Sequence, residues 1–102
     1  MIYHLTTSPE WQAAQRAGEY RPPSLEDEGF IHCSTDEQLQ PVAERFFQGV
    51  PDVLVLWIDP ERLSAQLLWE APTAGDAFAG QRFPHIYGPL NLDAVVQVSG
   101  LP

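Results

Sequence analysis

The sequence predicts a small α+β fold with about five or six short strands and two main helices. Short apolar runs bounded by turn residues are typical of strands, and two longer segments show apolar residues at helical spacing. Ten prolines in 102 residues keep these elements short, because proline interrupts helices and sheet ladders. A chain of this length is expected to form one domain, residues 1–102.

The predicted strands cover residues 2–6, 30–34, 53–58, 66–70, 82–88 and 94–99. Segment 53–58 is wholly apolar, which is typical of a strand buried on both faces. A helix follows the first strand, with Thr7 or Ser8 as its cap and Gly18 at its end.

The segments before and after the second predicted strand are assigned from their turn and cap residues and from the spacing of their apolar residues. Residues 19–28 hold two prolines and four acidic residues, which predicts a surface loop with at most one helical turn. Thr35 caps a second helix that ends at Gly49 and that Pro41 shortens or kinks. Its apolar face consists of Leu39, Val42, Ala43, Phe46 and Phe47. Residues 71–80 are small and predict a loop.

Charge excludes several classes of protein. The chain has 14 acidic residues, five arginines and no lysine, giving a net charge of −9. Neither nonspecific binding of nucleic acid nor binding to an anionic membrane is expected from this balance. The absence of lysine excludes Schiff-base chemistry.

No apolar run spans a membrane, no signal-peptide pattern begins the chain, and the single cysteine forms no internal disulfide, so a cytoplasmic location is expected.

Each of the three histidines is followed two residues later by a hydroxyl side chain: the pairs are His4 and Thr6, His32 and Ser34, and His85 and Tyr87. Residues i and i+2 of a strand share a face, so each imidazole is expected beside its hydroxyl. If two of the strands are neighbours, the histidines approach to ~5 Å across the ladder. Such groups suit hydrogen bonding to a ribose or phosphate and general acid–base work, although three half-buried histidines bonded to backbone carbonyls remain an alternative.

Two further residues, Glu70 and Cys33, have side chains of a type that takes part in catalysis or ligand binding. Glu70 ends a predicted strand, where it meets solvent, bonds a ribose hydroxyl or stabilises a developing cation. Cys33 should point away from the face of His32 and act as a small core residue. The histidines lack the HxH and HxxxH spacings of metal sites, so no metal is expected, and no Gly-x-Ser-x-Gly elbow indicates a serine hydrolase.

The segments that contain the histidines are IYHLT, GFIHCST and FPHIYGPLN. Together they resemble domain-of-unknown-function family 952, a small bacterial family grouped with the ADP-ribosyltransferase-like superfamily and related to its RNA 2′-phosphotransferase branch. The resemblance covers residues 2–98. It implies a split, mostly antiparallel β-sheet core with two main flanking helices and a cleft for NAD.

The same resemblance implies roles for individual residues. His4 would bind a ribose of NAD, while His32 and Ser34 would orient the nicotinamide end. Glu70, or His85 with Tyr87, would take the place of the glutamate found in many ADP-ribosyltransferases. Few arginines are present to hold an RNA phosphate, so a nucleotide-type small molecule, and no nucleic acid, is the expected partner.

The sequence therefore predicts an NAD-dependent ADP-ribosyl transferase or NAD-cleaving enzyme, and leaves oligomeric state open. The predicted catalytic residues are His4, His32, His85 and Glu70. The predicted NAD-binding residues are His4, Thr6, His32, Ser34 and Tyr87. Two alternatives stay open: a non-catalytic module that binds NAD or an ADP-ribose-type ligand, and a structural domain.

Overall fold

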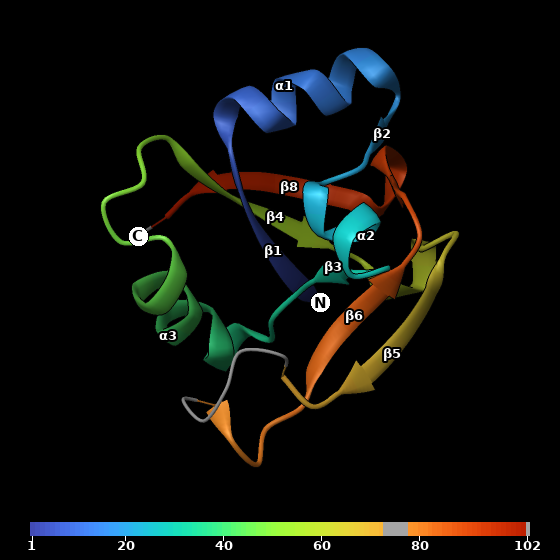
Figure 1. Ribbon diagram of the computed structural model, residues 1–102. Helices are drawn as coiled ribbons and strands as arrows, with labels where there is room; N and C mark the ends of the chain where they lie inside the picture. The colour runs from blue at the N-terminus through green and yellow to red at the C-terminus, as the bar shows by residue number, and fades with distance from the viewer. Residues whose placement is uncertain (73–77, 102) are drawn as a thin grey trace.

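The computed structural model describes residues 1–72 and 78–101, and the predicted loop 71–80 lies partly outside them. The strands are β1 (Ile2–Thr7), β2 (Glu19–Tyr20), β3 (Ile31–His32), β4 (Val53–Ile58), β5 (Gln66–Glu70), β6 (Phe83–Tyr87), β7 (Leu90–Asn91) and β8 (Val95–Gly100). The helices are α1 (Ser8–Ala17), α2 (Pro23–Asp27) and α3 (Asp36–Phe46), with short 3-10 turns η1 (Pro60–Arg62) and η3 (Leu92–Ala94). The α+β class and its two main helices, α1 and α3, are confirmed (Figure 1).

The strands form two three-stranded sheets and one short ribbon, and every pairing among the described strands is antiparallel. The sheet orders are β1-β4-β8 and β3-β6-β5, while β2 pairs with β7. The two larger sheets meet at one backbone bridge between Tyr3 and Ser34. Its two N–H···O bonds measure 2.9 and 2.7 Å. The edge of β1 is thereby placed beside the end of β3.

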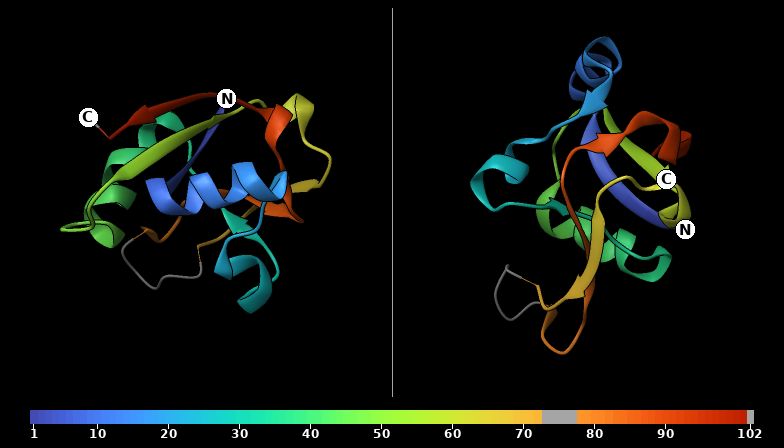
Figure 2. Two further views of the ribbon diagram at one scale, coloured as in Figure 1. Left: turned by 90° about the horizontal axis from the view of Figure 1, so that it is seen from above. Right: turned by 90° about the vertical axis from the view of Figure 1, so that its right-hand side faces the viewer.

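The helices cover opposite faces of the β1-β4-β8 sheet (Figure 2). Side chains alternate along a strand, so the two faces carry different residues. Ile2 and Leu56 lie in the core cluster that contains Ala14 of α1. Leu5 and Val55 lie in the cluster that contains Ala43 of α3. The amphipathic faces expected for both helices are therefore buried against the sheet.

Three predicted elements differ from those observed. The strand expected over residues 30–34 is reduced to β3, because the chain leaves β6 after Cys33 and bonds β1 through Ser34. The loop expected over residues 19–28 contains β2 and α2. The second main helix ends at Phe46, before Gly49, and keeps Pro41 inside it. None of the helices in residues 1–72 and 78–101 has the length and apolar content needed to cross a bilayer.

The two long helices begin differently, although threonine occupies both N-cap positions. The Thr35 side chain accepts the N–H of Gln38, and the Gln38 side chain bonds back to the Thr35 N–H, forming a capping box. Thr7 also precedes its helix, but its side chain makes no capping hydrogen bond.

This contrast predicts unequal effects of two matched substitutions. Thr35→Ala should lower the free energy of unfolding by about 1 kcal/mol, because a helix N–H loses its partner. Thr7→Ala should lower it by less than about 0.5 kcal/mol. Urea denaturation of both variants measures the difference, and equal losses would show that the capping box adds no stability.

Candidate functional site

The three histidines come from three strands and meet at the junction of the two sheets. His32 and His85 are direct partners across the β3–β6 ladder, and their ring centroids lie 5.4 Å apart. The expected approach across a ladder is confirmed. His4, on β1, donates from Nδ1 to the backbone carbonyl of His32 at 2.5 Å. The bridge between the sheets therefore assembles the cluster.

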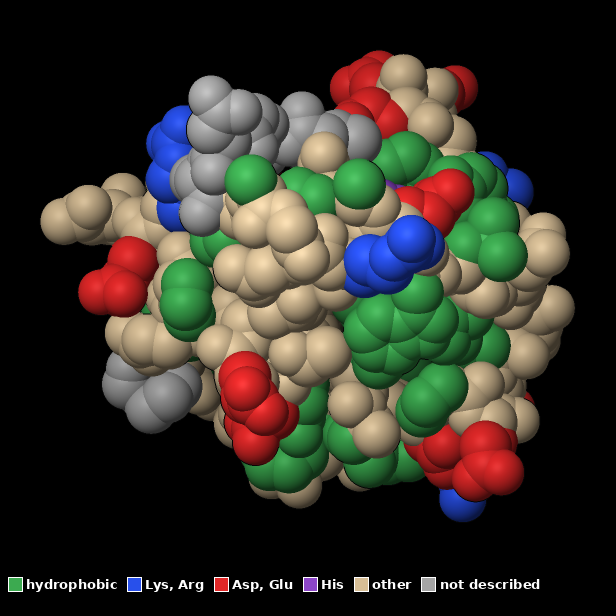
Figure 3. Space-filling model, turned by 90° about the horizontal axis from the view of Figure 1, so that it is seen from below, with side chains coloured by type: hydrophobic (Ala, Val, Ile, Leu, Met, Phe, Trp, Pro, Cys, Tyr) green, Lys and Arg blue, Asp and Glu red, His purple; other side chains and the backbone are tan. Residues whose placement is uncertain are grey.

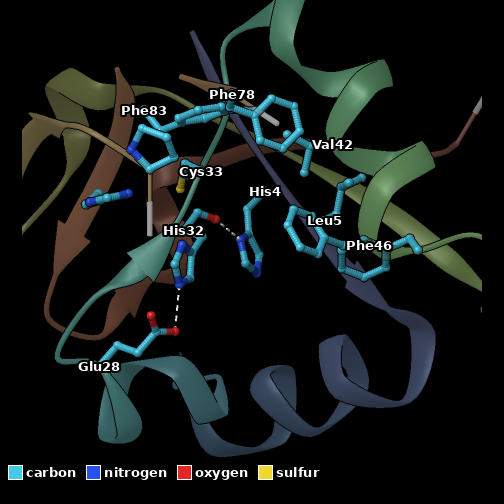
Figure 4. A pocket seen from close by; sticks show the side chains of 13 residues that line it. His4, Leu5, Glu28, His32, Cys33, Val42, Phe46, Phe78 and Phe83 are labelled. Atoms are coloured by element: carbon cyan, nitrogen blue, oxygen red, sulfur yellow. Dashed lines mark hydrogen bonds and ion pairs between the residues drawn. The ribbon is translucent and has the colours of Figure 1, made fainter. Parts of the chain in front are cut away.

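All three histidines line one pocket of about 370 Å³, which we call the histidine pocket. Its polar side also contains Glu28, Cys33 and Ser34. Its apolar side consists of Leu5, Val42, Phe46, Phe47, Pro72, Phe78 and Phe83. On the face shown in Figure 3, histidine appears only as a narrow area beside acidic side chains. Figure 4 shows the rings of His4 and His32 side by side, with Glu28 reaching His32 from the position just after the end of α2.

His4 is 8% exposed, and both of its ring nitrogens are engaged. Nδ1 carries the hydrogen donated to the His32 carbonyl, and Nε2 lies 2.7 Å from the Tyr20 hydroxyl. Burial lowers the pKa of His4 to about 4, so its ring is neutral near pH 7 and Nε2 accepts from Tyr20. Burial also raises the pKa of Tyr20, which keeps that hydroxyl protonated.

Thr6 and Glu10 continue this series of hydrogen bonds away from the pocket. The Thr6 hydroxyl lies 3.0 Å from the Tyr20 hydroxyl and 3.3 Å from Oε2 of Glu10. His4 and Thr6 thus share a face, as their spacing predicts, and both contact Tyr20. Thr6 is 2% exposed and stands behind His4 without lining the pocket.

His85 is paired with a carboxylate on the far side from the other rings. Nδ1 of His85 donates to Oε1 of Glu70 at 2.8 Å, and the Tyr87 hydroxyl donates to the same oxygen at 2.5 Å. The hydrogen bonds from Tyr87 and then His85 lower the pKa of Glu70, which favours the carboxylate. The Glu70 bond raises the pKa of Tyr87. Glu70 and Tyr87 do not line the histidine pocket, so they act on it through His85.

The carboxylate fixes the tautomer of His85. Because Nδ1 holds the hydrogen, a neutral His85 ring carries its lone pair on Nε2. This nitrogen has no hydrogen-bond partner among the described residues. His85 is only 2% exposed and lines the pocket, so it is the ring best prepared to accept a proton from a bound molecule.

His32 forms a second imidazole–carboxylate pair. Its Nε2 donates to Oε2 of Glu28 at 2.8 Å, and both side chains are about 40% exposed. Phe30 positions both partner rings of the ladder: it stacks on His85 at 4.1 Å and meets the edge of His32 at 4.8 Å. The ring orientations in the pocket therefore depend on Phe30.

The family is established by comparison with known proteins. Residues 5–98 match the profile described as Protein of unknown function (DUF952). This chain belongs to the DUF952 family. No protein of curated function matches it.

Solved structures of a protein from Caulobacter crescentus share the fold of this DUF952 chain. The crystal structure of protein CC0527 from Caulobacter crescentus is 34% identical, covers 99% of this chain and 85% of that chain, and has a TM-score of 0.84. Its solution NMR structure is 35% identical, covers 98% and 83%, and has a TM-score of 0.80. These matches support the α+β class, while membership of the ADP-ribosyltransferase-like superfamily stays a prediction.

The DUF952 site contains predicted residues and others that sequence reasoning missed. His4, His32, His85 and Ser34 line the pocket. Cys33 is 3% exposed in the main core, and burial raises the pKa of its thiol, in agreement with a core role. Among the described residues, no group of three or more His, Cys, Asp and Glu side chains is arranged to hold a metal ion.

Glu28, Phe30 and Tyr20 were not predicted. Phe30 lies two residues before His32, and the i, i+2 rule would have placed it on the same face had the rule been applied to aromatic residues. Glu28 lies four residues before His32 across a change of element, so its direction carried no local signal. Tyr20 reaches His4 only because β2 pairs with β7 far along the chain.

The buried His4 predicts a distinct dependence of stability on pH. Its pKa is about 4 in the fold against 6.5 in the unfolded chain, so the unfolded state binds more protons between these values. The free energy of unfolding should therefore fall as the pH drops from about 6.5 towards 4. His4→Asn removes the titrating ring but keeps an N–H for the His32 carbonyl.

Urea denaturation at pH 7 and pH 5 tests this prediction. The wild-type protein should lose about 2 kcal/mol more stability than His4→Asn over that interval. Acidic side chains titrate in both proteins and cancel in the comparison. Equal losses in the two proteins would contradict a low pKa at His4.

Proposed function

We propose that this DUF952 protein breaks the bond between nicotinamide and ribose in NAD and transfers the ribosyl group to an acceptor or to water. The observation that carries the proposal is the pocket-lining His85, whose Nδ1 is held by Glu70 and whose Nε2 has no partner among the described residues. A volume of about 370 Å³ is within the range of small-molecule sites. The resemblance to ADP-ribosyltransferase-like proteins supports the choice of NAD.

The chemistry requires one bond to break and one to form at the ribosyl carbon. The electron pair of the C–N bond leaves with nicotinamide, and positive charge develops on the ribosyl group. The oxygen of water or of an acceptor hydroxyl then bonds that carbon, and its proton passes to Nε2 of His85. With water as acceptor, NAD and water yield nicotinamide, ADP-ribose and one proton.

The remaining residues orient the substrate or one another. The phenyl rings of Phe78 and Phe83 offer surfaces for the nicotinamide ring, while His32 and Ser34 face it from the polar side. Both nitrogens of His4 are already bonded, so we assign His4 the positioning of His32 and not a direct bond to ribose. Glu70 likewise acts by orienting His85 through its bond to Nδ1.

A second candidate is a module that binds an NAD-type ligand without turnover. It is favoured by the position of Glu70, which does not line the pocket and therefore does not meet the ribosyl carbon directly. The two candidates differ in whether nicotinamide is released.

Release of nicotinamide from NAD is the direct test. The wild-type protein should release it with multiple turnovers, and His85→Gln should be slower by about 100-fold or more, because the proton acceptor is lost. Glu70→Gln keeps a hydrogen-bonding side chain without its charge, so we expect an intermediate rate. Arg16→Gln, at an exposed position of α1, is the matched control and should retain full activity.

The outcomes separate the candidates. Saturable NAD binding without release would favour the binding module, whereas release that is unchanged in His85→Gln would remove His85 from the mechanism. Neither binding nor release would overturn both candidates. A native NMR spectrum of each variant shows that lost activity does not reflect unfolding.

A further inference from the structure

We propose that the histidine pocket selects a positively charged pyridinium ring on an uncharged ribose, and excludes the phosphates of the ligand. This inference rests on the proposed function and narrows its substrate class. It predicts that, when a dinucleotide binds, the binding energy comes from its cationic pyridinium–ribose part and not from the dinucleotide as a whole. The argument depends on where the charges of this chain lie.

No arginine or lysine side chain is available to a phosphate inside the pocket. The chain has five arginines and no lysine, and all five arginines fall within the described residues. None of them lines the pocket. Arg21 is paired with Glu19 and Arg62 with Asp59, while Arg82 donates to the carbonyl of Trp69 and Arg16 is in the last turn of α1.

Arg45 is the arginine that comes nearest to a lining residue by a recorded contact. Its guanidinium lies 5.2 Å from the ring centroid of Phe46. Phe46 is 47% exposed, so this contact is at the rim and not inside the pocket. A phosphate within the pocket would therefore lose its water without gaining a permanently charged arginine or lysine as partner, which is costly.

The lining instead favours positive charge. Glu28 is the carboxylate among the described residues that line the pocket, and it lies beside His32. Among the lining residues, Phe46, Phe78 and Phe83 form a continuous aromatic group, with successive centroids 6.3 and 5.4 Å apart. Aromatic faces carry partial negative charge and attract cations, most strongly where water is excluded.

A pyridinium–ribose unit satisfies both sides of this pocket. Its flat cationic ring matches the phenyl faces and the Glu28 carboxylate, and its hydroxyls match His32, Ser34 and His85. Because nicotinamide is uncharged after the bond breaks, the attraction to the ring ends with the reaction. The same pocket would therefore hold the substrate more tightly than the released base.

Calorimetric and NMR titrations with five probes test the inference. They are nicotinamide riboside, its uncharged reduced form, nicotinamide mononucleotide, NAD and ADP-ribose. We expect nicotinamide riboside to bind about tenfold more tightly than the reduced form, which has nearly the same size. The mononucleotide and NAD should bind no more tightly than the riboside, and ADP-ribose should be weakest.

Two substitutions locate the source of the selectivity. Glu28→Gln keeps a hydrogen-bonding side chain for His32 but removes the charge. It should therefore weaken the binding of nicotinamide riboside by about fivefold or more and leave the affinity for the reduced form unchanged. Arg45→Gln is the matched control at the rim and should leave the affinities of all five probes unchanged.

Each outcome has a defined meaning. Equal affinity for the charged and reduced ribosides, or tighter binding of the mononucleotide that Arg45→Gln abolishes, would overturn the cation selectivity and leave the proposed function standing. Tighter binding of ADP-ribose than of the riboside would do the same. If no probe binds, the proposed function itself fails and the inference fails with it.

Discussion

Three hydrogen bonds join the edge of β1 to the chain around β3, and the site depends on them. Tyr3 and Ser34 exchange two backbone bonds, and Nδ1 of His4 adds a third to the carbonyl of His32. Without this junction, the β1-β4-β8 and β3-β6-β5 sheets would share no strand pairing. The bonds turn two small sheets into one split surface, and they place His4 beside the His32–His85 pair.

The three histidines occupy different electrostatic environments despite their proximity. His4 is buried, neutral and bonded at both nitrogens. His85 is buried but tied to the carboxylate of Glu70, and His32 is half-exposed and tied to Glu28. A protein gains different functions from one side-chain type in this way, because hydrogen bonds and burial fix which nitrogen carries a proton. Structural and chemical roles can thus be divided within one cluster.

Local patterns predicted much of this molecule. Apolar runs located β4 and β5 at their observed ends, and the capping signal at Thr35 located the start of α3. Alternation along strands predicted that each of His4 and His85 shares a face with a hydroxyl, and both pairs have a common partner in the structure. Alternation could not predict the contact between Tyr20 and His4, because that contact depends on the pairing of β2 with β7.

The sequence by itself determined the α+β class, the two main helices, the acidity of the chain and four of the residues that line the pocket, namely the three histidines and Ser34. These features depend on periodicity, capping and composition, which act over a few residues or over the whole chain at once. Only the tertiary structure decided that Glu70 stands behind His85, that Glu28 faces the pocket, and that no arginine does. Those positions follow from strand register and from the β1–β3 junction, which bring together residues far apart along the chain. Short-range sequence patterns carry no information about such contacts.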